Sequence, residues 1–290
     1  MRVVQRHELD LVFAADQAQR FHRRATASDI PRLPRFPERL NDLLGHARGE
    51  LAYRTASDPG AHEAATWEST TLALQAGVGV FTVAQQAEGT VDCQIGAETV
   101  TIPATGPMSW TNEGVWLQAL SFAMVCRERE RTDFLCAVPE ELFRASEAGG
   151  VPYAYMAPWG RALRGWWRQE PDYYDHLVEA VRQADPDAPG LGRDAAEHIA
   201  LLAFPRMKMF TALVENDQDA FNNALYQALE LHQTYWTRDD ERAAKPAAYV
   251  ALEPLALTCV ARELGFTVDV RSDYLPQALV DGTWVGEFPT

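Results

Sequence analysis

The sequence predicts a mainly helical protein, an array of helical hairpins that carries one small antiparallel β-hairpin. Three observations predict this fold class. Long segments place apolar residues at the spacing of a helix with one buried face. One short segment alternates apolar and polar residues around a two-residue turn, as a β-hairpin does. Two helical hairpins of similar pattern follow each other along the chain, which is typical of helical repeat proteins.

The N-terminal part contains three predicted helices, which span Val3 to Arg24, Glu38 to Thr55 and His62 to Gln86. Three prolines, at positions 31, 34 and 37, predict a stiff extended connector after the first helix, because proline fixes φ and disfavours helix before it. The third helix is apolar almost all round, so it should lie at the centre of the fold. Its Gly77 and Gly79 favour close helix packing over a phosphate loop, since no strand precedes them.

The β-hairpin pairs Thr90 to Ile95 with Thr99 to Ile102 across a Gly96-Ala97 turn. Two strands alone are marginally stable, so the hairpin should pack on the helices or gain a third short strand. Thr267 to Val270 is one candidate for that strand.

The middle of the chain reads as a helix from Glu113 to Arg131 and a broken pair of short helices between Asp133 and Ala145. Gly149 to Pro152 is the best internal boundary. It divides the chain into residues 1–148, which hold the β-hairpin at 90–102, and residues 149–290, which hold the helical hairpins. We expect both parts to pack as one globular unit.

The clearest helical hairpin spans Met207 to Trp236, with its turn at Glu215 to Asp217. Asp217 is placed to cap the second helix with a side-chain oxygen. The apolar face of that helix consists of Phe221, Ala224, Leu225, Ala228, Leu229, His232, Tyr235 and Trp236. Its opposite face is polar, so one side should be buried and the other exposed.

A similar unit covers Arg161 to Ala184, and its turn residue Glu170 stands 47 positions before Asp217. Such a spacing is typical of helical arrays. The match slips by one residue farther along, however, and two unrelated amphipathic hairpins would look alike, so both interpretations stay open. After Trp236 the chain predicts a charged loop, a helix from Pro246 to Leu264 that kinks near Pro254, and a tail that docks by its aromatic residues.

The composition bounds the function. The chain has 290 residues, 47% of them hydrophobic, and a net charge of −15. Such a negative surface repels phosphate backbones, which disfavours nucleic-acid binding, whereas it would attract a basic protein. An acidic excess that only maintains solubility is the alternative. We expect no membrane partner and a cytoplasmic location, because the sequence shows no secretory signal and no convincing membrane span.

The sequence contains no recognisable catalytic, metal-binding or phosphate-binding motif. The four cysteines stand apart from other metal ligands, and no pair of histidines has ligand spacing. Nucleophile-elbow and phosphate-loop motifs are absent as well. His232 lies on an apolar helix face and is predicted to be a core histidine. We therefore predict no catalytic, cofactor-binding or metal-binding residue, although an enzyme with dispersed catalytic residues stays open.

Acidic residues gather near predicted helix ends and turns, and we expect them to bind a basic protein partner. The candidate partner-binding carboxylates are Glu170, Asp172, Asp175, Asp217, Asp219, Asp239, Asp240 and Glu241. Possible aromatic anchors among them are Tyr173, Tyr174 and Trp236. Reversing the charge of Asp217, Asp219, Asp239 and Asp240 should weaken such binding.

Three segments resemble the immunity 49 family, antidotes of bacterial polymorphic toxin systems. They run from Glu98 to Phe143, from Asp217 to Trp236 and from Leu252 to Pro276. The resemblance implies a mostly helical intracellular protein that binds a cognate toxin and blocks it. It assigns no inhibitory residues to this sequence, and we expect no cofactor. An adaptor built from helical repeats and unrelated to toxins is the other interpretation that the sequence leaves open.

Overall fold

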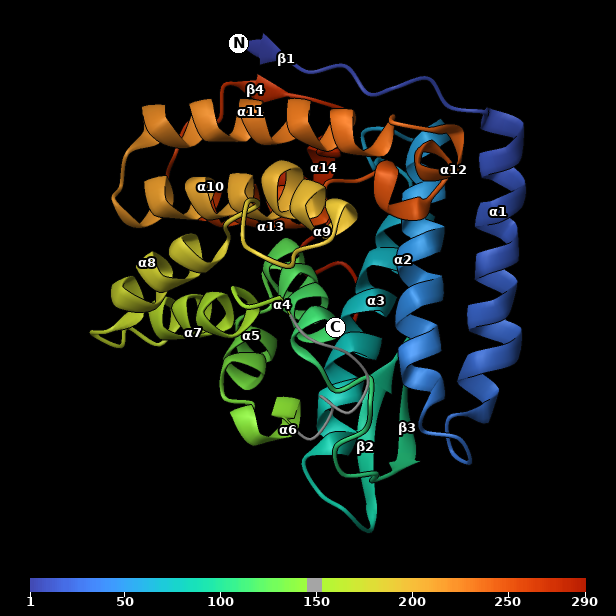
Figure 1. The fold of residues 1–290 in the computed structure, drawn as a ribbon. Coiled ribbons are helices and arrows are strands. Elements are labelled where there is room, and N and C mark those ends of the chain that lie inside the picture. Colours follow the sequence, from blue (N-terminus) through green and yellow to red (C-terminus); the bar gives the residue numbers. More distant parts are fainter. Residues whose placement is uncertain (145–152) are drawn as a thin grey trace.

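The computed structural model describes residues 1–144 and 153–290 (Figure 1), so the boundary predicted at Gly149 to Pro152 lies outside the described residues. The helices of the first part are α1 (Leu11–Arg23), η1 (Arg24–Asp29), η2 (Ile30–Arg32), α2 (Arg39–Ser57), α3 (Ala64–Ala84), α4 (Glu113–Cys126), α5 (Arg129–Cys136) and α6 (Glu140–Arg144). The helices of the second part are α7 (Met156–Trp167), α8 (Tyr173–Gln183), α9 (Arg193–His198), η4 (Ile199–Ala203), α10 (Phe204–Val214), α11 (Gln218–Trp236), α12 (Asp240–Ala243), η5 (Pro246–Ala248), α13 (Leu252–Glu263) and α14 (Gln277–Asp281). The prediction of a mainly helical fold is confirmed.

The helices α1, α2 and α3 lie side by side, and α4 packs on the far side of α3 (Figure 1). The α7–α8 and α10–α11 hairpins stand beyond α4. Of the 21 residues of α3, 17 are buried, which explains why this helix is apolar all round. Its buried hydroxyl groups bond within the helix or to the residue that ends α2; Thr66 Oγ1, for example, donates to Asp58 Oδ2 at 2.8 Å.

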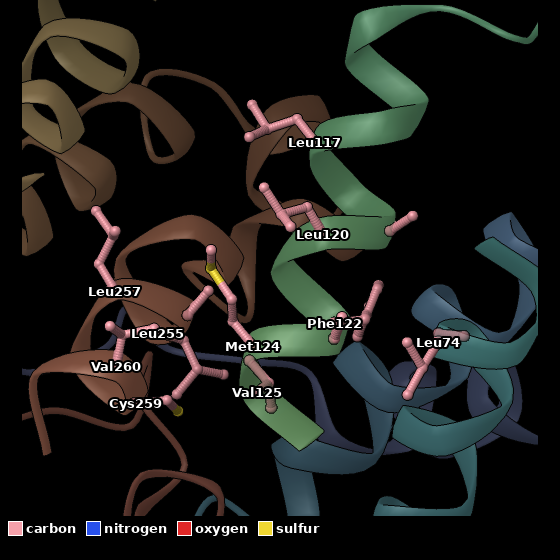
Figure 2. Packing of buried hydrophobic residues seen from close by; sticks show 14 of the residues in the cluster. Leu74, Leu117, Leu120, Phe122, Met124, Val125, Leu255, Leu257, Cys259 and Val260 are labelled. Carbon is pink, nitrogen blue, oxygen red and sulfur yellow. The ribbon is translucent and has the colours of Figure 1, made fainter. Parts of the chain in front are cut away.

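The contact between α3 and α4 depends on Gly77. A Cβ placed on this residue would lie 2.8 Å from Ala119 Cβ and 3.1 Å from Ala119 Cα, so the predicted close packing is confirmed. On its other side α4 meets α13. Figure 2 shows Leu120 and Met124 directed toward the helix that carries Leu255 and Val260. Hydrophobic residues of α3, α4 and α13 belong to one buried cluster.

The predicted β-hairpin is present as β2 (Thr90–Ile95) and β3 (Glu98–Pro103), paired antiparallel. Gly96 has a φ of +61° at the first loop position, which a type II′ turn requires and glycine readily adopts. Of the two predicted alternatives, the hairpin packs on the helices, because Cys93, Ile95 and Ile102 belong to the main hydrophobic cluster. In the described residues it gains no third strand. Of the candidate Thr267 to Val270, only Val270 lies in a strand, β4 (Val270–Arg271), which pairs in parallel with β1 (Arg2–Val3) in a separate sheet.

The predicted first helix begins too early, because β1 occupies its start. Asp10 sets the real N-terminus: its side chain accepts hydrogen bonds from the N–H groups of Val12 and Phe13, at 3.0 and 2.9 Å. The extended connector is also wrong. The chain from 24 to 32 is wound into a π-helix and a 3₁₀ turn, where Pro31 fits because a first-turn residue needs no N–H partner.

Two other predicted helices have different bounds in the structure. The predicted helix from Glu113 stops at Cys126, because Arg127 adopts a left-handed conformation with φ +58°. Its guanidinium then donates to the carbonyls of Leu279 at 2.6 Å and Val280 at 2.8 Å. The helix predicted from Pro246 does not kink at Pro254. It begins anew at Leu252, so that Pro254 falls in the first turn.

All four cysteines, Cys93, Cys126, Cys136 and Cys259, are free and buried. Within the described residues, no helix combines the length and the apolar character needed to cross a membrane.

Candidate functional site

The turn of the α7–α8 hairpin and the turn of the α10–α11 hairpin lie at the same end of the molecule (Figure 1). One left-handed residue ends the first helix of each hairpin: Gln169 at φ +58° and Asn216 at φ +55°. The next residue, Glu170 or Asp217, donates its N–H to the carbonyl five residues earlier, at 2.8 and 2.9 Å. This is the Schellman pattern of helix ends. Both turns thus have an acidic residue directly after the left-handed residue. A repeat of the whole 47-residue unit stays a prediction.

A hydrogen bond joins these two turns. The Tyr174 hydroxyl donates to Glu215 Oε1 at 2.9 Å. Half-buried Tyr173 packs against Gly165, where an added Cβ would lie only 2.9 Å from Tyr173 Cβ. The two turns therefore form one surface, which we call the acidic end. Its carboxylates are Glu170, Asp172, Asp175, Glu215, Asp217 and Asp219.

Few cations neutralise the acidic end. Arg168 pairs with Glu170 at 3.1 Å, and His176 lies 3.5 Å from Asp172. Asp175 and Asp219 are exposed and form no ion pair with any residue in the described ranges. Asp217 caps α11, as predicted: its Oδ1 accepts from the N–H of Ala220 at 2.9 Å.

The other predicted carboxylates lie at the far end of α11. Nineteen residues separate the two ends, which is about 28 Å at the helical rise. There, Asp239 caps α12 and lies 3.7 Å from Arg242, while Glu241 pairs with Lys245 at 3.0 Å. Asp240 is exposed. The predicted carboxylates thus form two separate groups, and in the second group Asp239 and Glu241 have basic partners, whereas Asp240 forms no ion pair with any described residue.

Trp236 does not project from the acidic end. It is half-buried, packs on a small cluster that contains Tyr53 and Tyr249, and its Nε1 is buried without a hydrogen-bond partner. Together with His232, it lines a cleft that the sequence did not predict.

This cleft has a volume of about 750 Å³ and lies between the α2–α4 side and the α9–α13 side of the fold. Its lining includes side chains from Arg48, Leu51, Leu117, Gln118, Tyr153, Tyr155, His198, Leu201, Leu202, Arg206, His232, Trp236, Val250, Leu252 and Glu253. No local pattern could reveal it, because its walls come from segments 200 residues apart. Within residues 1–144 and 153–290, no group of three or more His, Cys, Asp or Glu residues could hold a metal ion.

Arg206 and Glu253 form an ion pair in the wall of the cleft. The Arg206 side chain is 6% exposed, and its Nη1 donates to the Glu253 carboxylate. Nη2 reaches the Tyr155 hydroxyl at 3.4 Å, and the guanidinium lies 5.7 Å from the centre of the Tyr155 ring. Burial raises the pKa of Tyr155 to about 12. The pair is therefore a fixed, internally neutralised part of the wall.

Two histidines of the cleft are held neutral. Burial, assisted by the charge of Arg206, lowers the pKa of His198 to about 4, and its ring stacks on Tyr153 at 5.3 Å. Burial lowers the pKa of His232 to about 3, against the opposing effect of the Ala248 backbone. His232 is buried, as predicted. Neither imidazole bonds a carboxylate of the described residues.

A comparison with protein families identifies the chain. Residues 58–279, more than half of its length, match the model described as Immunity protein 49. No curated protein and no solved structure matches it. The matched region contains both turns of the acidic end and most of the cleft, whereas α1 and α2 lie before it. The chain belongs to the immunity protein 49 family.

Proposed function

We propose that this protein binds a cognate bacterial toxin through its acidic end and blocks the toxin in the cytoplasm. Membership of an immunity protein family carries the proposal, because it implies toxin neutralisation. The acidic end supports the binding mode. Its exposed Asp175 and Asp219 have no basic partner among the described residues, so they are available to a basic surface.

A basic toxin face is the partner that this surface fits. Complementary charge raises association rates and discourages wrong partners. A standard interface covers about 800 Å² on each protein. The two inter-helix turns of the acidic end are too small to provide this area alone. We therefore expect the α7–α8 and α10–α11 hairpins to contribute together, with Tyr174 as an aromatic contact because it is 41% exposed.

Enzymatic removal of the toxin's effect is less favoured by the site. A general base works best with a pKa near the working pH, whereas the pKa values of His198 and His232 are lowered to about 4 and about 3. No carboxylate of the described residues orients either ring. Direct binding needs neither group to react.

Two charge-reversed variants with the same change in net charge test the surface. The first replaces Asp172, Asp175 and Asp219 with Lys at the acidic end. The second replaces Asp194, Asp240 and Glu241 with Lys near the other end of α11. None of these six side chains caps a helix, whereas Asp217 and Asp239 do, so charge reversal at those two would also perturb folding.

The measurements are growth rescue and co-purification when each variant is co-expressed with the product of the neighbouring gene. The first variant should lose at least about tenfold in toxin affinity, mainly through slower association. The second should bind nearly as the parent does. Equal losses would mean that only net charge matters, and no loss in the first variant would exclude the acidic end. Rescue without a complex would indicate enzymatic reversal, and a complex without rescue would indicate an adaptor.

A further inference from the structure

Arg48 is a cation of the cleft without a carboxylate partner. Its Nη1 donates to the neutral amide oxygen of Gln118 at 2.7 Å, and its Nε is buried with no partner. Its Nη2 forms no hydrogen bond with any described residue, and it is not among the buried atoms that lack a partner, so it reaches open space. Burial lowers the pKa of this guanidinium, and no neighbouring charge offsets the effect.

Two other charges of the cleft, Arg206 and Glu253, neutralise each other. Glu113 also lines the cleft and forms no ion pair with any described residue, because Arg161 and Arg164 pair with Glu140 instead. Burial is the cause of the lowered pKa of Arg48 and no carboxylate offsets it, so this guanidinium is uncompensated although the protein as a whole carries −15. A partly buried charge without a partner costs stability. An anionic ligand that binds there would supply the missing partner.

His198 adds a second polar group. Its ring forms no hydrogen bond with any described residue, and neither of its nitrogens is among the buried unpartnered atoms. The imidazole therefore presents polar nitrogens to the cleft and stays neutral at pH 7. It can donate one hydrogen bond to an oxygen atom without adding charge.

The walls around these groups are mainly apolar. They include Leu51, Leu117, Leu201, Leu202, Val250 and Leu252. A volume of about 750 Å³ falls within the range of small-molecule sites, which combine apolar walls with a few polar groups. An inorganic anion would leave this apolar surface unused, and an uncharged apolar ligand would leave Arg48 uncompensated.

We propose that the cleft binds a small amphiphilic carboxylate, with the carboxylate at Arg48 and an apolar body against the leucine-rich walls. The ligand would carry one negative charge on an otherwise hydrophobic skeleton. This inference concerns a site other than the acidic end, so it does not depend on the proposed function.

Octanoate and its uncharged analogue octanamide test the proposal, with binding to the full chain measured by calorimetry. Octanoate should bind at least about tenfold more tightly than octanamide, as a charge-assisted hydrogen bond allows. Arg48→Met keeps the apolar stem and removes the charge, so this variant should bind both compounds alike. Arg20→Met, on an exposed arginine of α1, is the matched control and should behave as the parent does.

Folding stability gives a second readout. Because Arg48 has no carboxylate partner, Arg48→Met should keep or raise the Tm of the ligand-free protein while it loses octanoate binding. Equal affinity of the parent for octanoate and octanamide would overturn the proposal, and so would no binding of either. If octanoate does not bind but Arg48→Met abolishes toxin co-purification, the carboxylate belongs to the toxin and the small-ligand site is wrong.

Discussion

Acidification should destabilise this protein through His232. The side chain is 5% exposed, and burial lowers its pKa to about 3 from the usual 6.5. Below pH 6.5 the unfolded chain therefore binds a proton that the folded chain refuses. Stability falls as the pH falls from 6.5 toward 3 and does not depend on this group above pH 7.5. Each pH unit within that window costs about 1.4 kcal/mol.

Between pH 7.5 and pH 5, His232 alone should lower the free energy of unfolding by about 2 kcal/mol. That is a large part of the 5–15 kcal/mol typical of a domain. The variant His232→Gln cannot titrate, so its loss over the same interval should be smaller by about this amount. His198 remains in the variant, and burial lowers its pKa to about 4, so some pH dependence persists.

Urea unfolding at pH 7.5 and pH 5, followed by tryptophan fluorescence, measures the two losses. The quantity compared is the loss of unfolding free energy between pH 7.5 and pH 5. A packing change caused by glutamine affects both pH values equally, so it cancels when the m-value stays constant. His62→Gln is the control, because His62 is exposed, and it should lose as much stability as the parent. If His232→Gln and the parent lose the same amount, His232 accepts a proton in the folded state and the reasoning is wrong.

Other substitutions test the packing directly. Gly77→Ala should lower the free energy of unfolding by about 1–3 kcal/mol, because its new Cβ would lie 2.8 Å from Ala119 Cβ. Adding Ala119→Gly should recover part of this loss in urea unfolding. If it recovers none, the strain is not between these two residues. Arg206→Met should cost about 3–5 kcal/mol in the same measurement by leaving Glu253 unpaired, and adding Glu253→Gln should restore most of it if the pair is the cause. Asp217→Ala should cost about 0.5–2 kcal/mol through loss of the α11 cap, and a neutral result would show that the cap is dispensable.

Local patterns predicted the helices well where one residue type decides the outcome. Asp217 caps α11 as expected, and glycine at position 77 permits the close helix contact. The prediction failed where distant segments decide. The strand at Val270 pairs with Arg2 and Val3, and Arg127 ends α4 while it binds carbonyls of α14. Spacing along the chain carries no signal for either contact.

The candidate site shows the same division. The acidic turns were visible because helix ends favour acidic caps and turn residues, which the sequence displays locally. Their grouping was not visible. The helix α11 separates Asp217 from Asp239 by its full length. The hydrogen bond from Tyr174 to Glu215 joins two turns whose contact the sequence pattern does not indicate.

The sequence by itself determined the helical class, the β-hairpin, the negative charge and the family resemblance, because periodicity, turn residues and composition act over a few neighbouring positions. Only the tertiary structure decided which carboxylates share a surface and that an unpaired Arg48 lines an apolar cleft. The physical reason is that a cleft has walls from helices far apart in the chain, and whether a buried charge has a partner depends on how those helices pack.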